Sequence, residues 1–493
     1  MQHGGGFHRV VPAPATSLSR AGPSVAALGH GHYPLAPSPS RLLDASSASL
    51  RREILRLAWP AAVQNLLQTG MFVADTKMVG LLPGPGPLAA CGIVGPLLWS
   101  ITVIFTVFAV GTTALVARAK GEGDEGKVRA ALATSFGLAG LLGLPVAAAG
   151  ILGARPIVHA FAGGTVSADV LEMAVGYLRF TIGAFPFDFL AIAAMAALRG
   201  AGDTRTPMLA TLGANLFNVV GNYFLIYGHA GFPRLGVPGA GLATGLAGVL
   251  EAGFLLLALA RGSGGRLRFA PGDLRAASRA TLGVLARVSG PSALEAILFH
   301  GAFLLYQRAV FALGEAAVAA HRVAITLESI AFMPAYGFHI AAAALSGQML
   351  GARDPARASR GVVETARIGT ALMGLVSLAF LALPSPLASL FSDDPGVLAQ
   401  ARRCLPVAAV EIPFLTIAFA LSGGMRGAGA TRGPLLATLI GAWGLRVPLA
   451  YLLGSTRALG LPGIWVATTL DWATRTALLA WLFRRGAWKE VRL

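Results

Sequence analysis

Charged side chains are scarce in this chain. Asp, Glu, Lys and Arg together make up 12% of its 493 residues, whereas apolar residues make up 55%. Soluble domains carry about a quarter charged residues, so this composition argues against a soluble domain. The mean hydropathy of +0.68 fits a polytopic membrane protein, because each helix that crosses a bilayer needs about 20 mostly apolar residues.

Cysteines and catalytic motifs are also lacking. The two cysteines, Cys91 and Cys404, have no metal-ligand spacing, which argues against a disulfide framework or a structural metal. The sequence contains no G-x-S-x-G, no H-E-x-x-H and no paired catalytic carboxylates, as a membrane-embedded enzyme would require. We therefore expect neither an enzyme nor a resident cofactor.

Acidic residues are outnumbered, 22 against 39 basic residues, which gives a net charge of +17. The basic residues do not form one patch, so we expect no nucleic-acid partner. They cluster in alternate connections between apolar stretches, at Arg118, Lys120, Lys127 and Arg129, Arg199 and Arg205, Arg261 to Arg279, Arg353 to Arg360, Arg426 and Arg432, and Arg484 to Arg492. This positive-inside bias places both termini in the cytoplasm, and we expect a multi-pass protein of the inner membrane.

Long apolar stretches are what the chain has in abundance, and they predict an all-α membrane protein. Twelve such stretches lie at about 54–80, 88–118, 130–152, 172–195, 207–228, 239–260, 282–312, 316–350, 362–384, 400–421, 434–454 and 462–483.

The second half of the chain repeats the first in order, at an offset of about 230 residues. ALRGAGDTRTP from Ala197 returns as GMRGAGATRGP from Gly424, and LGVPGAGLAT from Leu235 returns as LGLPGIWVAT from Leu459. Six apolar stretches fall in each copy. Internally duplicated apolar chains are commonly transporters, whose halves flank a central path.

Changes in composition divide the chain into five segments. Residues 1–50, rich in Gly, Pro, Ser and Ala, predict a disordered tail, although their Ser- and Arg-rich character leaves an organelle transit peptide as a minor alternative. A six-helix lobe at 51–261, a cytoplasmic linker at 262–281, a second six-helix lobe at 282–485 and a cytoplasmic tail at 486–493 follow.

A charge inside the hydrocarbon layer costs about 2.5–3.5 kcal/mol on insertion scales, so a charged residue within an apolar stretch is a candidate functional residue. Asp75 lies in the first apolar stretch, and helical spacing places Gln64 and Gln68 on roughly the same side. The side chain of Asp75 is either a cation or proton site or a structural partner of Lys77 or Arg308.

The fifth stretch supplies amides for such a site. Asn218 and Asn222 are four residues apart and share one helix face. Their oxygens could bind an alkali cation or accept from a protonated carboxyl, although buried Asn pairs more often join neighbouring helices. Thr244, at the start of the sixth stretch, could add a hydroxyl or bond its own backbone.

Together these motifs resemble the multidrug and toxic compound extrusion (MATE) transporters over almost all of residues 54–485. The resemblance lies in Q-T-x-x-x-x-x-D-T-x-x-V-G from Gln68, A-x-R-G-x-G-D-T-R-x-P around Arg199, the N-x-x-x-N pair and G-x-G-x-A-T before Thr244. The resemblance implies two pseudo-twofold-related six-helix lobes. It also implies efflux of organic, often cationic or amphipathic compounds by antiport with H⁺ or Na⁺.

The resemblance also implies a cation site. Asp75, Asn218, Asn222 and Thr244 match the family's first-helix carboxylate, fifth-helix amides and sixth-helix hydroxyl. A Na⁺ at Asp75, Asn218 and Asn222 is the one metal that it allows. Many members have Asp where this chain has Asn222, so the site has one fewer formal charge, which favours protons.

A second proton or substrate site is expected at Glu295, with Gln64, Gln68 and His300 as further candidate residues. Glu295 lies one turn after Pro291 in the helix equivalent to the first, and it resembles the P-x-x-L-E-x-x-L-F element of some bacterial members. His300 follows one turn later. The alternative for Glu295 is a structural pair with Arg308, His321 or Arg322.

Two other functions compete with drug efflux. A lipid-linked precursor flippase of the same superfamily would share the duplicated bundle, but it would need several basic residues in its cleft. A membrane-embedded enzyme is the other. We expect small organic substrates, a lipid bilayer around the helices and a monomer.

Overall fold

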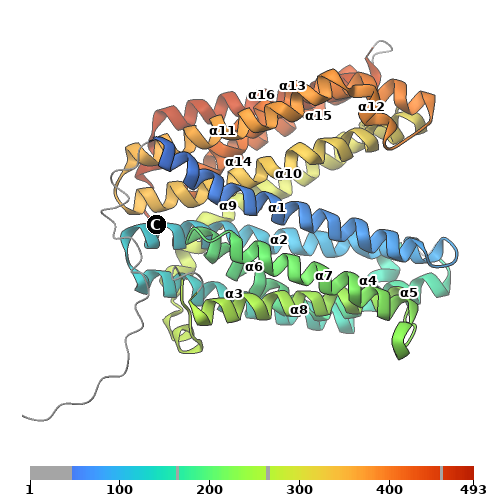
Figure 1. The fold of residues 1–493 in the computed structure, drawn as a ribbon, viewed down its shortest axis with the longest axis horizontal. Helices are drawn as coiled ribbons and strands as arrows, with labels where there is room; N and C mark the ends of the chain where they lie inside the picture. Colours follow the sequence, from blue (N-terminus) through green and yellow to red (C-terminus); the bar gives the residue numbers. More distant parts are fainter. Residues whose placement is uncertain (1–46, 163–165, 263–266, 456–458) are drawn as a thin grey trace, which may run out of the picture. The chain divides into compact units, whose positions relative to one another are not determined.

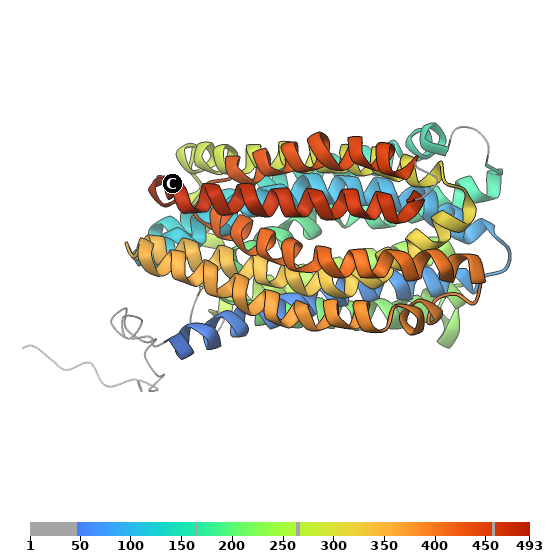
Figure 2. The ribbon, with the colours of Figure 1, turned by 90° about the horizontal axis from the view of Figure 1, so that it is seen from above.

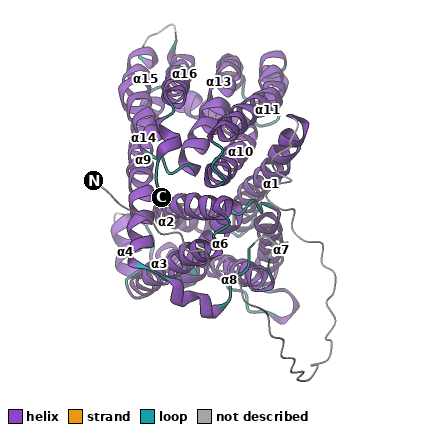
Figure 3. Cartoon of the chain, turned by 90° about the vertical axis from the view of Figure 1, so that its left-hand side faces the viewer, coloured by secondary structure: helices purple, strands orange, loops and turns teal. Residues whose placement is uncertain are grey.

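The computed structural model describes residues 47–162, 166–262, 267–455 and 459–493. The expected tail at 1–50 therefore lies almost wholly outside the described residues. Throughout these ranges the ordered elements are helices, and no strand is found in them (Figure 3). The prediction of an all-α protein is confirmed.

The first half of the chain forms eight α-helices. They are α1 (Ser47–Gly80), α2 (Gly86–Glu122), α3 (Glu125–Leu152), α4 (Ala154–Ala162), α5 (Ala168–Gly183), α6 (Phe185–Gly200), α7 (Arg205–Tyr227) and α8 (Val237–Arg261). We call this set the N-lobe. A short 3₁₀ turn, η2 (His229–Gly231), joins α7 to α8, and another, η3 (Pro271–Ala276), lies in the linker.

The second half, which we call the C-lobe, repeats this order with small changes. It contains α9 (Arg279–Phe311), α10 (Glu315–Gly351), α11 (Pro355–Ala382), α12 (Pro384–Ser389), α13 (Pro395–Gly427), α14 (Arg432–Thr438), the π-helical η4 (Leu439–Arg446), α15 (Val447–Gly454) and α16 (Gly460–Arg485). A final 3₁₀ turn, η5 (Ala487–Glu490), follows.

Each of the twelve predicted apolar stretches falls on one of these helices or on one continuous series of them. Within the described residues, nine helices are long and apolar enough to cross a membrane, and the pair α5 and α6, bent by 46°, makes a tenth. The bend falls just before Pro186, where proline cannot donate a backbone hydrogen bond. The other two of the twelve predicted stretches lie on α1 and α16, which are more polar and carry Asp75 and Asp471 of the sites described below.

Helices α1, α2, α9 and α10 bring the two lobes together. Helix α1 packs against α7 of its own lobe and against α10 of the other, and α2 packs against α9 and α10 as well as α5 and α6. The views in Figures 1 and 2 show α1 running beside α10.

The lobes meet most closely at one end of the bundle, which we call the basic end because it carries Arg118, Lys120, Lys127, Arg353 and Arg357. Gly351 faces the carbonyl of Arg118 there, and Gly121 faces the backbone of Gln348. Along α10, every residue in the range 337–347 is buried. Only glycine permits backbones to approach this closely.

The second close contact of this joint involves the beginning of α1. A Cβ added at Gly337 would lie 2.8 Å from the carbonyl oxygen of Ala58 and 2.8 Å from the amide of Ala62. Gln348 also donates a hydrogen bond of 2.8 Å to the carbonyl of Gly200 across the lobes. The joint is therefore built largely from main-chain atoms.

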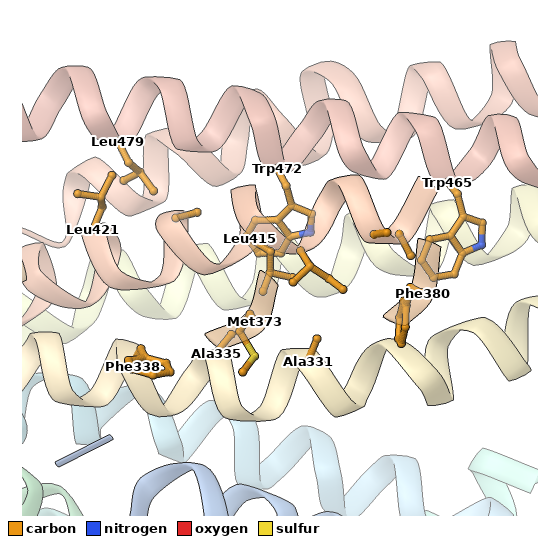
Figure 4. Packing of buried hydrophobic residues seen from close by; sticks show 14 of the residues in the cluster. Ala331, Ala335, Phe338, Met373, Phe380, Leu415, Leu421, Trp465, Trp472 and Leu479 are labelled. Atoms are coloured by element: carbon orange, nitrogen blue, oxygen red, sulfur yellow. The ribbon is translucent and has the colours of Figure 1, made fainter. Parts of the chain in front are cut away.

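Each lobe has its own apolar core. In the C-lobe, Trp472 of α16, Leu415 of α13, Met373 of α11 and Ala335 of α10 point towards one another (Figure 4). The N-lobe buries two clusters of apolar side chains, one around Leu198 and one around Leu178. These cores fix the helices that carry the polar groups described next.

Candidate functional site

Asp75 of α1 lies against two asparagines of α7. The Asn222 amide donates a hydrogen bond of 2.5 Å to Asp75 Oδ1 and one of 3.1 Å to Asn218 Oδ1. Asn218 in turn donates to the hydroxyl of Thr244, on α8, at 3.1 Å. Both asparagines are fully buried, and Asp75 is half-buried. The structure therefore brings together the four residues expected at the cation or proton site.

Close packing of three helices holds this cluster. The spacing of four residues places Asn218 and Asn222 on one face of α7, towards α1 and α8. Gly221 allows α7 to approach α8, because a Cβ added there would lie 3.2 Å from the Cβ of Ala243. The adjacent residues Asn222 and Thr244 are thereby held within reach of Asp75.

The hydrogen bonds leave specific acceptor positions open. The Thr244 hydroxyl donates to the carbonyl of Ala240 at 2.9 Å, and its contact with Asp75 Oδ2 is much longer, at 3.5 Å. The Asn222 Oδ1 atom is buried and has no hydrogen-bond partner. A proton on Asp75 Oδ2 could be donated to Thr244 Oγ1, whereas a cation would find oxygens from Asp75, Asn222 and Thr244.

Gln68 does not join this cluster. Its side chain is exposed, whereas Gln64, one turn earlier, is fully buried. Gln64 donates to Thr211 at 2.9 Å and accepts from Arg199 at 2.8 Å. It therefore belongs to a second polar network, nearer the basic end.

That second network extends to α8. Thr211 donates a hydrogen bond of 2.6 Å to Glu251, so Gln64, Thr211 and Glu251 link α1, α7 and α8. Arg199, from α6, completes the set. The sequence alone does not identify the partners of Glu251, because helical periodicity does not fix the register between helices.

Glu295 of the C-lobe is held in an ion pair. Arg426 donates to Glu295 Oε2 at 2.7 Å, and Thr438 donates to Oε1 at 2.9 Å. This partner, Arg426 of α13, is none of the three considered from the sequence, which were Arg308, His321 and Arg322. His300 bonds the carbonyl of Ala296 in its own helix, at 2.8 Å, and does not reach this group.

Asp471 is the centre of two further buried ion pairs of the C-lobe. Arg475 contacts it through Nε at 2.5 Å and Nη2 at 3.0 Å, as the spacing of four residues predicts. Arg446, at the end of the π-helical η4, contacts Asp471 Oδ2 at 2.7 Å. All three side chains are at most 5% exposed.

The chain matches a family model over residues 60–224 and 291–452, and the model is described as MatE. The chain belongs to the MATE family. The probable multidrug resistance protein NorM of Thermotoga maritima is 30% identical over 90% of this chain and 94% of its own length. The multidrug resistance protein NorM of Burkholderia vietnamiensis is 32% identical over 87% and 92% of the two chains.

Solved MATE structures share this fold. One, described as MATE in complex with MaL6, superposes with a TM-score of 0.82 over 92% of this chain and 100% of that one, at 23% identity. Another, described as an outward-facing conformation of a multidrug resistance MATE family transporter, gives a TM-score of 0.80 over 92% and 99%, also at 23% identity. The expected MATE architecture of twelve membrane helices in two lobes is confirmed.

Among the described residues, no group of three or more His, Cys, Asp or Glu side chains could hold a metal ion. Asp75 is accompanied by amide groups and a hydroxyl instead.

Proposed function

We propose that this multidrug efflux protein of the MATE family exports organic, often cationic or amphipathic compounds by antiport with H⁺, and that Asp75 carries the proton. The single observation that supports this most is the arrangement of Asp75, Asn222 and Thr244. Asp75 Oδ2 has a hydroxyl acceptor at 3.5 Å and no short donor in that direction, so a proton can be added there without displacing another group.

The proposed step begins with ionised Asp75. In that state it accepts from Asn222 at 2.5 Å. On protonation, the new O–H donates to Thr244 Oγ1, whose own O–H continues to donate to the carbonyl of Ala240. The contact shortens, so the end of α1 shifts against α8, and the substrate loses part of its binding surface. Reversal on the other side of the membrane releases the proton.

The side of the membrane follows from charge. We place the basic end in the cytoplasm, in line with the positive-inside rule, and both termini with it. Since the lobes meet at that end through Gly121 and Gly351, the described conformation corresponds to one closed on the cytoplasmic side. The inner membrane is the proposed location.

Na⁺ remains the second candidate ion because a specific oxygen supports it. Asn222 Oδ1 is buried without a partner, and it belongs to the same amide group whose nitrogen donates to Asp75. One carboxylate with neutral oxygens is a weak charge set for Na⁺, however, and the proton is therefore the first choice. The chain is proposed to act as a monomer with no cofactor besides the coupling ion.

Drug efflux is favoured over lipid-precursor flipping by the relatives, which are named multidrug resistance proteins. The basic side chains inside the C-lobe also have carboxylate partners, as Arg426 and Arg475 show. They are therefore not free to bind a pyrophosphate group.

The test is efflux of a cationic dye from proteoliposomes under an imposed pH gradient or an imposed Na⁺ gradient, each alone. We expect efflux with the pH gradient, and its loss in Asp75→Asn. Glu172→Gln is the matched control, because Glu172 is an exposed acid of the same lobe, paired with Arg155 at 2.7 Å. Full gradient-driven export by Asp75→Asn would disprove the role of Asp75.

A further inference from the structure

Two acidic side chains of the C-lobe face each other inside the protein, away from the Asp75 site. Glu411 of α13 is 1% exposed, and neither of its carboxylate oxygens has a hydrogen-bond partner among N–H and hydroxyl donors. The group that lies within hydrogen-bonding reach is Glu328 of α10, another carboxyl. Helices α10 and α13 pack directly against each other.

We propose that Glu328 and Glu411 hold one exchangeable proton between them, as a second proton site in the C-lobe. An ionised carboxylate can only accept hydrogen bonds. Two ionised carboxylates in contact would repel and leave buried oxygens unsatisfied, whereas one proton lets either group donate to the other. This inference rests on the proposed proton-coupled function and adds a second proton to it.

The surrounding charges call for one proton. The cluster contains three acids, Glu328, Glu411 and Asp471, and two guanidinium groups, Arg446 and Arg475. Both guanidinium groups contact Asp471, at 2.7 Å and 2.5 Å. With all five groups ionised the net charge is −1, and one shared proton makes the buried cluster neutral.

The neighbouring titratable groups have partners of their own. From α9, Tyr306 bonds Thr468. On α10, His321 bonds Gln307 at 2.8 Å and His339 contacts the carbonyl of Phe419 at 3.0 Å.

The remaining helices packed on this pair bring few charges to it. Helix α11 has no charged residue after Arg367, and α12 has none. Helix α1 has none between Arg56 and Asp75, and α2 has none before Arg118. Helix α6 meets α10 at the basic end, where Gln348 bonds Gly200. Arg446 and Asp471 are therefore the charged groups that act on the pair.

Glu295 was the sequence-based candidate for a second proton site, and the geometry favours Glu328 and Glu411 over it. Both oxygens of Glu295 already accept hydrogen bonds, from Arg426 and Thr438, so neither is open to a second carboxyl group. Glu328 is half-buried whereas Glu411 is 1% exposed, so Glu328 is the more accessible member of the pair.

Infrared difference spectroscopy on the full chain in lipid tests the proposal, because a protonated carboxyl has its own C=O band. We expect Asp75→Asn to retain a protonated-carboxyl band that disappears when the pH is raised. We expect Asp75→Asn/Glu411→Gln, and separately Asp75→Asn/Glu328→Gln, to lose that part of the signal. Glu295→Gln in the same background is the control and should leave the band unchanged.

The result is independent of the proposed role of Asp75. If the band is unchanged in both double variants, the second proton site is overturned. If the band is lost as expected but Asp75→Asn still exports dye under a pH gradient, the assignment of Asp75 fails and the C-lobe site stands. Glutamine keeps the size of the side chain, and circular dichroism of each variant confirms that it is folded.

Discussion

Gln64 and Glu295 occupy the same place in the two halves of the chain. Gln64 accepts from Arg199 at 2.8 Å and bonds Thr211 at 2.9 Å, and Glu295 accepts from Arg426 at 2.7 Å and Thr438 at 2.9 Å. The duplicated motifs that carry Arg199 and Arg426 thus make the same contact in both lobes. The difference is one formal charge.

The first prediction uses this correspondence. Glu295→Gln should keep both hydrogen bonds, as Gln64 does, but remove the charge that faces Arg426. We expect a loss of roughly 1–2 kcal/mol, because a charge-assisted hydrogen bond becomes a neutral one. Glu295→Ala should cost about 3–5 kcal/mol, since it leaves a buried guanidinium unpaired. Thermal unfolding in detergent measures both, and equal losses would contradict the interpretation.

A second prediction concerns the choice of coupling ion. Asn222→Asp adds a carboxylate beside Asp75 and replaces the amide that donates to it at 2.5 Å. We expect dye efflux driven by a Na⁺ gradient alone to increase, because two carboxylates attract a monovalent cation more strongly than one. The comparison is wild-type protein at the same density in the same liposomes. Unchanged Na⁺ dependence would argue that the site does not bind the cation.

Thr244 offers a third test, aimed at the proton itself. Thr244→Val keeps the shape of the side chain and removes the hydroxyl that lies 3.5 Å from Asp75 Oδ2. If that hydroxyl accepts the transported proton, efflux driven by a pH gradient should fall about tenfold, which corresponds to roughly 1.4 kcal/mol. Thr244→Ser should retain most of the activity. Equal activity of the Val and Ser variants would rule out the hydroxyl as the acceptor.

The glycine joint between the lobes gives a fourth prediction. Gly337→Ala places a methyl group 2.8 Å from the carbonyl oxygen of Ala58, so α1 and α10 must separate. We expect a loss of about 1–3 kcal/mol in stability and slower efflux. Gly374→Ala is the matched control, because a Cβ there has no neighbour within 4 Å. Its stability should rise by roughly 0.5–1 kcal/mol.

Much of the fold was predictable because its signals are local. Apolar stretches define the spans, and the repeated motifs indicate two equivalent halves. Asn218 and Asn222 were assigned to one helix face from their spacing, and they lie together against Asp75. Gln68 was grouped with Gln64, but it points roughly 40° further round the helix, beyond the edge of the contact, and is exposed.

The partners across helices could not be predicted in the same way. The structural partners considered for Glu295 lie in α9 and α10, yet its partner Arg426 is 131 residues away in the chain, in α13. Periodicity gives the face of a helix but not the height at which a second helix crosses it. The repeat itself held the missing signal, since Arg199 and Arg426 lie in equivalent copies of one motif.

The contact of Gly337 with Ala58 and that of Gly351 with Arg118 also bear on how such a pump can diversify. Peptide groups are the same in every sequence, so a joint built from them does not depend on a particular pair of complementary side chains. Residues that contact the substrate can then be substituted while the main-chain contacts of the joint stay the same. Substitutions that change which compounds are bound therefore need not disturb the packing of the two lobes at this joint.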